Sequence, residues 1–314
     1  MYKTRIETEI NSEYKYLTPF ISSLPEIFSI EGETIYEGRN TLKWFQIEGV
    51  NLVVKSFKKP HIINKIAYSF FRESKAKRSY LYALDLLERG VVTPAPIAYI
   101  NEYKHGLLSR SYYICVYQRN ASPIAPYVNG DAEDRVLLSD MVRFIVSLHE
   151  KNVLHLDLSP GNVLIEKSEG QNKFSIIDIN RLKIEDIDKD KAYKNFARLA
   201  RNRYVSTTIA EIYADERGWD REEAIETINK YSDDFFRFKT FSFARKEMKK
   251  YYGTFMSFCG PVQLYRIVSL LRKLMPFHGL KQKLFKLESN LYFKYIIWSD
   301  VRRVLMADNH YEEK

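Results

Sequence analysis

A polar loop between two short apolar strands reads Val153-Leu154-His155-Leu156-Asp157-Leu158-Ser159-Pro160-Gly161-Asn162-Val163-Leu164-Ile165. After a turn at residues 168–172, a third apolar run reads Phe174-Ser175-Ile176-Ile177-Asp178. The apolar runs on either side of this turn predict a hairpin, whose end lies beside its beginning. We therefore expect Asp157, Asn162 and Asp178 to converge on one small volume. Two carboxylates and an amide oxygen in such a volume suit Mg²⁺ and a phosphoryl group in transfer.

Length and composition predict a folded chain with a large core. It has 314 residues, of which 45% are hydrophobic and 28% are charged, which favours two folded lobes over a disordered chain. Cys115 and Cys259 stand far apart and in no metal-type spacing, which favours a reduced, cytoplasmic protein without structural zinc. The sequence contains no signal-peptide core at its N-terminus, and no apolar run approaches the roughly 20 residues that span a bilayer.

The first part of the chain is predicted to form several β-strands followed by a helix. Strands are predicted at residues 34–37, 42–47 and 52–57. One helix is predicted at about 61–89, with Gly90 as its C-cap. The lead-in, residues 1–30, is expected to contain one or two strands, because Thr18-Pro19 and Leu24-Pro25 interrupt a helix.

A linker separates this part from a mostly helical one. The linker is predicted between Gln118 and Asn129, so that an N-lobe spans residues 1–118 and a C-lobe spans residues 119–314. An amphipathic helix at 132–150 leads into the polar loop. After Asp178 we expect helices, with breaks near Gly218, Gly253, Gly260-Pro261 and Pro276. This order predicts an α+β protein with a small antiparallel β lobe and a larger, mostly α-helical lobe.

Each polar residue of the loop suits one part of a phosphotransfer reaction. Asp157 would orient an acceptor hydroxyl and accept its proton, while Asn162 and Asp178 would hold Mg²⁺. His155 would brace the loop by hydrogen bonds. The alternative is an ordinary surface turn, since Ser159-Pro160-Gly161-Asn162 is good turn material. The flanking strands and the position of Asp178 favour the functional site.

These residues resemble the catalytic loop and the metal-binding aspartate of the protein-kinase-like superfamily. The resemblance implies a bilobal, protein-kinase-like fold that uses ATP and Mg²⁺. It also implies that Lys55, on the third predicted strand, contacts the nucleotide phosphates. The first β turn, with Gly38, Arg39 and Asn40, would stand in for the nucleotide-binding loop, although it lacks the usual GxGxxG pattern.

Three departures point away from regulated protein kinases. Ser159 stands where Ser/Thr protein kinases have a lysine, and the metal motif is Asp178-Ile179-Asn180, with neither Phe nor Gly. The helical pattern resumes near Lys191, which leaves little room for an activation segment. These departures favour a sugar, a lipid or a small molecule as the acceptor.

More closely, the chain resembles the lipopolysaccharide kinase (Kdo/WaaP) family over roughly residues 35–185. Besides the catalytic loop, the matching stretches are Tyr36-Glu37-Gly38-Arg39-Asn40, Val53-Val54-Lys55-Ser56-Phe57, Ser74-Lys75-Ala76-Lys77-Arg78-Ser79-Tyr80, Thr93-Pro94-Ala95-Pro96-Ile97-Ala98-Tyr99 and Ile177-Asp178-Ile179-Asn180-Arg181. The resemblance implies ATP-dependent phosphorylation of a hydroxyl on a Kdo-type or heptose-type sugar of the lipopolysaccharide core. The reaction would take place on the cytoplasmic face, before export.

The sequence leaves the partner of Lys55 open. Kinases pair this lysine with a glutamate on the following helix, and Glu73 lies 18 positions after Lys55. Counted back from the helix end at Gly90, however, the partner position falls near Ser79. Glu73 is therefore either the partner of Lys55 or a solvated helix residue.

The C-terminal part of the chain is basic. Residues 239–314 contain 15 Lys and Arg against 6 Asp and Glu, which accounts for the whole net charge of +9. The simplest interpretation is an apolar stripe packed on the helical lobe with solvated charges. The alternative is peripheral contact with an anionic membrane surface or with the phosphates of a glycolipid. The sequence carries no nucleic-acid-binding motif, and we expect no nucleic-acid partner.

Two other functions fit the same residues. One is a kinase of another small molecule or of protein side chains, because residues 157–162 are close to the aminoglycoside phosphotransferase loop. The other is a non-catalytic kinase-like binding module, which the weak glycine loop favours. The presence of Asp157, Asn162 and Asp178 together opposes the binding module.

Overall fold

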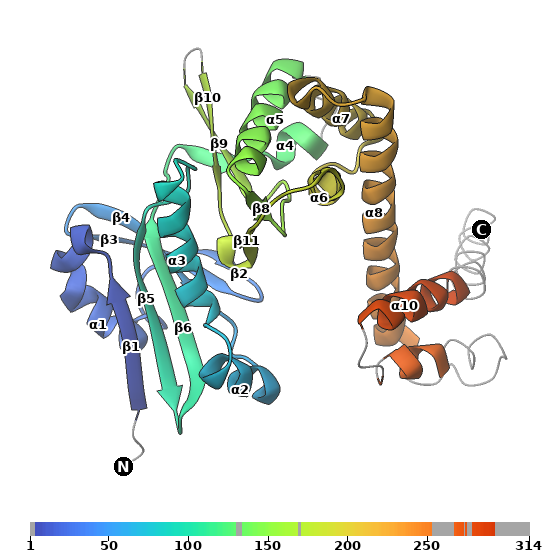
Figure 1. The fold of residues 1–314 in the computed structure, drawn as a ribbon. Helices are drawn as coiled ribbons and strands as arrows, with labels where there is room; N and C mark the ends of the chain where they lie inside the picture. Colours follow the sequence, from blue (N-terminus) through green and yellow to red (C-terminus); the bar gives the residue numbers. More distant parts are fainter. Residues whose placement is uncertain are drawn as a thin grey trace, which may run out of the picture. The chain divides into compact units, whose positions relative to one another are not determined.

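The structure is a computed structural model that describes residues 4–129, 134–168, 171–252, 267–272, 274 and 278–292. The chain divides into two compact units, Met1–Ser232 and Asp233–Lys314. The first unit contains all the strands of the described residues and all the candidate site residues (Figure 1).

A six-stranded antiparallel sheet forms the N-terminal part of the first unit, with the strand order β1-β5-β6-β4-β3-β2. Its strands are β1 (Thr4–Ile10), β2 (Glu33–Glu37), β3 (Thr41–Ile47), β4 (Val50–Ser56), β5 (Pro96–Lys104) and β6 (Leu107–Val116). The predicted meander corresponds to β2, β3 and β4, which are neighbours in the sheet. The lobe boundary expected between residues 118 and 119 remains a prediction, although the sheet ends at Val116.

Helices cover both faces of this sheet, because successive side chains of a strand point to opposite sides. Ile100 and Ile114 belong to the core cluster that includes α1 (Thr18–Ile27). Tyr99 and Tyr113, one position away, belong to the cluster that includes α3 (Lys75–Glu88). Figure 1 shows α3 lying along β5 and β6.

The expectation that prolines exclude a helix from residues 1–30 is wrong. α1 follows β1 and a 3-10 helix, Ser12–Leu17, and contains both Pro19 and Pro25. Pro19 lies in the first turn, where the missing N–H group has no partner to lose within the helix. Burial of Ile21 and Leu24 against the sheet stabilises the helix despite Pro25.

The single helix predicted at about 61–89 is in fact two helices, α2 (Ile62–Phe70) and α3. The side chain of Ser74 accepts a hydrogen bond of 3.0 Å from the backbone N–H of Lys77 and thereby caps the start of α3. At the other end, Gly90 has a φ of +66°, as expected of a residue that follows a helix C-cap.

The rest of the first unit is mostly helical, with two small sheets of order β10-β9-β7 and β11-β8. Its strands are β7 (Ala121–Pro123), β8 (Val153–His155), β9 (Val163–Ser168), β10 (Gln171–Ile176) and β11 (Leu182–Ile184). Its helices are α4 (Ala125–Asn129), α5 (Arg135–Glu150), α6 (Lys189–Asn195), α7 (Arg203–Arg217) and the start of α8 (Arg221–Tyr252). One core cluster joins α3 to α5 and α7, so this part packs directly against the helix of the N-terminal sheet.

In the second unit, the structure describes the end of α8, a short helical stretch at 267–272 and α10 (His278–Tyr292). Arg272 forms a 2.5 Å ion pair with the buried Glu288, and the rings of Phe238 and Phe285 lie 4.6 Å apart. The helix breaks predicted at Gly253, Gly260-Pro261 and Pro276 lie outside the described residues. In the described ranges, no helix is both long enough and apolar enough to cross a membrane.

Candidate phosphotransfer site

The hairpin β9–β10 brings the two ends of the polar loop together. Val163 pairs with Ile176 in the antiparallel register, and the N–H of Ile177 donates a 2.9 Å hydrogen bond to the carbonyl of Asn162. Asp178 therefore follows directly after the residue bonded to Asn162. The amide Nδ2 of Asn162 donates a 2.8 Å hydrogen bond to the carbonyl of Asp157. The structure thus brings together the three residues that the sequence predicted to converge.

His155 links both halves of this arrangement from a buried position. Its Nδ1 accepts a 3.1 Å hydrogen bond from the N–H of Asp157, so its Nε2 carries the proton and donates to the carbonyl of Ile177 at 2.9 Å. Burial lowers the pKa of His155 and outweighs its hydrogen bond to Ile177 and the nearby carboxylates. A neutral imidazole therefore fixes the start of the loop to the segment before Asp178.

A chain of buried polar side chains from three helices is hydrogen-bonded to the backbone of His155. Nδ2 of Asn195, at the end of α6, donates to the carbonyl of His155 at 2.8 Å. Oδ1 of Asn195 accordingly accepts from Nε2 of His149 at 3.0 Å, and Nδ1 of His149 accepts from the Tyr213 hydroxyl at 2.8 Å. Burial lowers the pKa of His149 to about 4. This chain of neutral hydrogen bonds connects α5, α6 and α7 to the loop.

Asp178 occupies a left-handed backbone conformation, with a φ of +56°. Its Oδ1 accepts hydrogen bonds from Nζ of Lys55 at 2.7 Å and from Nδ2 of Asn180 at 2.5 Å. Burial acts to raise the pKa of Asp178, but Lys55, His155 and Arg181 together lower it below its ordinary value. The carboxylate is therefore charged and held in one orientation.

Asn162 and Asp178 each have a side-chain oxygen that could coordinate a magnesium ion. Among the described residues, the hydrogen bonds that the Asp178 carboxylate accepts all go to Oδ1, and 31% of its side chain is exposed, so Oδ2 can bind a cation. The hydrogen bond from Nδ2 of Asn162 turns its oxygen away from Asp157. One carboxylate and one amide suffice because Mg²⁺ usually completes its shell with phosphate oxygens and water.

Two arginines engage the carboxylate of Asp157. Arg198 forms an ion pair with Oδ1, and Nη1 of Arg181 lies 3.7 Å from Oδ2. Neither arginine was singled out from the sequence as a site residue. Arg181 stands three positions after Asp178, so a search around the metal motif could have found it. Arg198 carries no local signal, because it reaches Asp157 only through the folding of the segment after α6.

Lys55 pairs with Asp178 and not with Glu73, the residue that the spacing suggested as its partner. Alternation along β4 puts Leu52 and Val54 in the core cluster of α1, so Lys55 points to the opposite face, where α3 lies. Glu73 precedes the N-cap of α3, is 47% exposed, and lies 3.5 Å from Nζ of Lys77. The break between α2 and α3 places Glu73 outside the helix from which a glutamate would reach Lys55. Ser79, the position favoured by the other count, is buried and donates to the carbonyl of Lys75 at 2.9 Å.

The first residue of α3, Lys75, adds a cation that the sequence did not single out. Burial and the charges of Arg39, Arg181 and Arg78 lower the pKa of Lys75, while Asp178 acts in the opposite direction. Lys75 therefore interacts electrostatically with Arg39 of the predicted nucleotide loop and with Asp178 and Arg181 of the metal motif. The site therefore gathers positive charge from β4, α3, the β2–β3 turn and the segment after Asp178.

The β2–β3 turn holds the residues predicted to stand in for a glycine loop. The N–H of Gly38 donates to the carbonyl of Asn40 at 3.1 Å, and Oδ1 of Asn40 accepts from the N–H of Lys58 at 3.2 Å. Arg39 is exposed, and its charge acts on Lys75. The roles of Gly38, Arg39 and Asn40 toward a nucleotide stay predictions.

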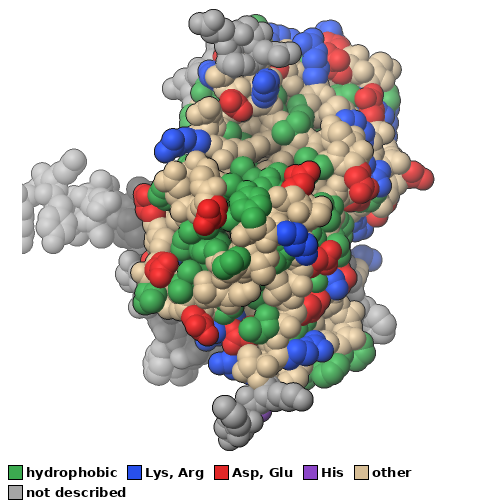
Figure 2. Space-filling model, turned by 90° about the vertical axis from the view of Figure 1, so that its left-hand side faces the viewer, with side chains coloured by type: hydrophobic (Ala, Val, Ile, Leu, Met, Phe, Trp, Pro, Cys, Tyr) green, Lys and Arg blue, Asp and Glu red, His purple; other side chains and the backbone are tan. Residues whose placement is uncertain are grey.

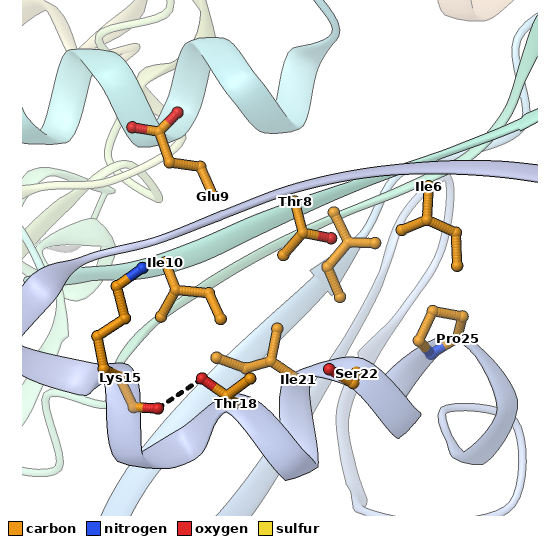
Figure 3. A pocket seen from close by; sticks show the side chains of 10 residues that line it. Ile6, Thr8, Glu9, Ile10, Lys15, Thr18, Ile21, Ser22 and Pro25 are labelled. Atoms are coloured by element: carbon orange, nitrogen blue, oxygen red, sulfur yellow. Dashed lines mark hydrogen bonds between the residues drawn. The ribbon is translucent and has the colours of Figure 1, made fainter.

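A cavity of about 380 Å³ lies elsewhere, between β1 and α1. Figure 3 shows isoleucine side chains of the strand and the helix facing each other there, with Glu9 pointing away. The face that carries β1 and α1 shows apolar side chains near its centre with acidic and basic ones around them (Figure 2). The cavity is lined by Ile6, Thr8, Glu9, Ile10, Lys15, Thr18, Ile21, Ser22, Pro25 and Ile100. None of the predicted site residues lines this cavity, so it is separate from the phosphotransfer site.

Comparison with known proteins identifies the family. A model of the lipopolysaccharide kinase (Kdo/WaaP) family matches residues 32–228, more than half of the chain. The 3-deoxy-D-manno-octulosonic acid kinase of Haemophilus influenzae (strain 86-028NP) is 25% identical over 192 residues, which cover 58% of this chain and 79% of that protein. The protein of the same name from Vibrio cholerae serotype O1 is 24% identical over 185 residues, which cover 57% of this chain and 77% of that protein.

The fold has a counterpart among solved structures. A structure of WaaP in complex with acyl carrier protein superposes with a TM-score of 0.51 and 15% identity, covering 73% of this chain and 98% of that one. The likeness confirms the expected α+β, protein-kinase-like bilobal fold. With the match over residues 32–228, the chain belongs to the lipopolysaccharide kinase (Kdo/WaaP) family and is a kinase.

Proposed function

We propose that this kinase transfers the γ-phosphoryl group of ATP to a hydroxyl of a Kdo-type or heptose-type sugar in the lipopolysaccharide core. The observation that carries the proposal is the 2.7 Å ion pair between Lys55 and Asp178. It joins the strand that would bind nucleotide phosphates to the hairpin that holds Asn162 beside Asp157. The reaction would take place at the cytoplasmic face of the inner membrane.

The residues divide the reaction between them. Asp157 would accept the proton of the sugar hydroxyl as its oxygen forms a bond to the γ-phosphorus and the bond to ADP breaks. Asp178 and Asn162 would hold Mg²⁺, which when bound neutralises phosphate charge. Lys55 would exchange its contact with Asp178 for one with the phosphates, and Lys75 would add a second positive charge on that side.

The surroundings of Asp157 support an anionic acceptor. Arg181 and Arg198 both approach its carboxylate, and a guanidinium group binds carboxylates and phosphates with two parallel hydrogen bonds. A sugar acid such as 3-deoxy-D-manno-octulosonic acid, or a sugar that is already phosphorylated, would bring such a group close to the hydroxyl. A neutral or cationic acceptor would gain nothing from these arginines.

The test is phosphate transfer from ATP labelled at the γ-position, with Mg²⁺ and a panel of acceptors. The panel contains a Kdo-bearing lipid A precursor, a heptose-bearing core, an aminoglycoside and casein. We expect label on a lipopolysaccharide sugar alone, with mass spectrometry locating one added phosphoryl group on that sugar. Label on the aminoglycoside or on casein, or no transfer to any acceptor, would contradict the proposal.

A matched pair of variants ties the transfer to the site. Asn162→Ala removes an oxygen that would hold Mg²⁺, so transfer should fall on the order of a hundredfold or more. Asn172→Ala, in the same hairpin, removes only a hydrogen bond of 2.8 Å to Asp140 and should leave transfer within about twofold.

A further inference from the structure

The helix α2 turns its apolar side outward. Ile62, Ile66 and Phe70 are spaced by four residues, which places them on one face of the helix. Their exposed fractions are 60%, 43% and 66%, and the next residue, Phe71, is 84% exposed. An amphipathic helix on a globular protein normally buries such a stripe against the core. Here the stripe faces away from the protein.

The opposite side of α2 is fixed to the sheet. The hydroxyl of Ser69 accepts a 2.9 Å hydrogen bond from the N–H of Leu108 in β6 and donates to the carbonyl of Lys65 at 2.6 Å. Figure 1 shows α2 beside the start of β6, next to the turn that joins β5 to β6. The contact with β6 therefore determines which face of α2 is presented outward.

Positive charges surround the outward stripe. Residues 58–72 include Lys58, Lys59, Lys65 and Arg72 but no Asp or Glu. In the part of the chain that the structure describes, none of these four cations forms an ion pair with a carboxylate. Large apolar side chains flanked by unpaired cations are complementary to an anionic lipid surface, which offers an acyl region beneath negative headgroups.

We propose that α2 docks this kinase onto an anionic membrane, with Phe70 and Phe71 inserted at the acyl boundary and the flanking cations against the headgroups. The proposal deepens the proposed function, on which it rests for the nature of the acceptor, a sugar carried by a lipid in the membrane. In sequence, α2 lies between Lys55 and Lys75, two cations of the phosphotransfer site. Docking through α2 would hold the kinase at the surface that carries such an acceptor.

The experiment is flotation of the full chain with vesicles, in the absence of nucleotide and acceptor. Vesicles of phosphatidylethanolamine and phosphatidylglycerol are compared with vesicles of phosphatidylcholine. We expect binding to the anionic vesicles that falls steeply with salt, and at least tenfold weaker binding to phosphatidylcholine. Equal binding to both kinds of vesicle, or none to either, would overturn the proposal.

Variants locate the docking surface. The double variant Phe70→Ser, Phe71→Ser should bind anionic vesicles on the order of tenfold more weakly, and Lys59→Gln about fivefold more weakly. Ile30→Ser is the matched control, because Ile30 is 79% exposed but lies after α1, and it should bind like the wild type. The melting temperature of each variant should match that of the wild type. Wild-type binding by the Phe70 and Phe71 variant would place the membrane contact elsewhere and overturn the proposal.

A second readout separates failure of docking from failure of the proposed function. The phenylalanine variant should phosphorylate a soluble, delipidated core oligosaccharide as fast as the wild type, but should be several-fold slower on the same core embedded in anionic vesicles. Vesicle binding that depends on Phe70 and Phe71 without any kinase activity would refute the proposed function and leave the docking surface standing. Equal loss of activity on both acceptors would overturn the docking role.

Discussion

The two sides of the phosphotransfer site are held in place by different kinds of interaction. On the catalytic-loop side, buried neutral groups hold the backbone through hydrogen bonds that run from Tyr213 through His149 and Asn195 to His155. On the cationic side, Lys55 is held by an ion pair with Asp178, while burial, together with the charges of nearby arginines, lowers the pKa of Lys75.

The loop side therefore supplies a preorganised geometry, and the cationic side supplies charge for binding phosphate. Neutral buried donors and acceptors can fix the geometry of Asp157 and Asn162 without altering the charge of the site. On the cationic side, the charges of Arg39, Arg78 and Arg181 disfavour the charged form of Lys75. The phosphates of bound ATP would offset this repulsion. We infer that the loop side is complete before ATP binds, while the cationic side reaches its most favourable state only with phosphate present.

The largest effect is expected from Asp178→Asn, because Asp178 is the residue at which the two sides meet. The variant removes both a predicted metal ligand and the partner of Lys55, so transfer should fall on the order of a thousandfold. Steady-state kinetics with Mg²⁺ and ATP measure the change. Asp186→Asn, an exposed carboxylate nearby in sequence, is the control and should stay within about twofold. Near-normal turnover by Asp178→Asn would show that the two sides do not form one site.

A pH dependence of stability should come from the loop side. Folded His149 takes up a proton only near pH 4, whereas the unfolded chain does so near 6.5. Between these values the unfolded state binds more protons, so the free energy of unfolding should fall as the pH drops from 6.5 to 4 and should gain nothing above 6.5. The total for His149 is on the order of 3 kcal/mol.

Urea unfolding at a series of pH values measures this slope. His155, whose pKa is also lowered by burial, contributes in the same direction. His149→Gln should flatten the slope between pH 4 and 6.5, whatever its effect on stability at neutral pH. An unchanged slope in that variant would mean that His149 is not held neutral by burial.

A smaller effect is expected from Lys75→Met, which removes one cation but leaves the Lys55–Asp178 pair. The KM for ATP should rise about tenfold, with kcat less affected, because one phosphate contact is lost while the loop side is intact. The matched control is Lys77→Met in the same helix, since Lys77 pairs with Glu7 at 3.3 Å on the sheet. If Lys75→Met leaves the KM unchanged, Lys75 does not belong to the nucleotide side of the site.

The smallest effect is expected from Glu73→Gln. Its ion pair with Lys77 at 3.5 Å is exposed, and such pairs contribute about 0–1 kcal/mol to stability. Activity should therefore stay within about twofold of the wild type. A large loss of kcat would restore Glu73 as the partner of Lys55.

Local features of the site could be predicted from the sequence, and long-range ones could not. The convergence of Asn162 and Asp178 follows from the register of a short hairpin, which turn chemistry and strand length determine. The pair of Lys55 with Asp178 joins residues 123 positions apart, and no spacing rule identifies it. For the same reason, the approach of Arg198 to Asp157 was missed.

The errors in the fold have local physical reasons. The helical pattern continues across residues 71–74, and only the capping hydrogen bond of Ser74 shows that a new helix begins there. In α1, burial of one side outweighed the presence of two prolines. The basic part at 239–314 is only partly described, and both interpretations of it, packing on the helical lobe or peripheral contact with a membrane, stay predictions.

The most direct test of the central claim is Asp157→Asn, because it separates nucleotide binding from phosphate transfer. We predict that the variant keeps the thermal shift given by Mg²⁺ and ATP, while transfer to the lipopolysaccharide acceptor falls on the order of a hundredfold. Transfer at the wild-type rate by Asp157→Asn would contradict the account.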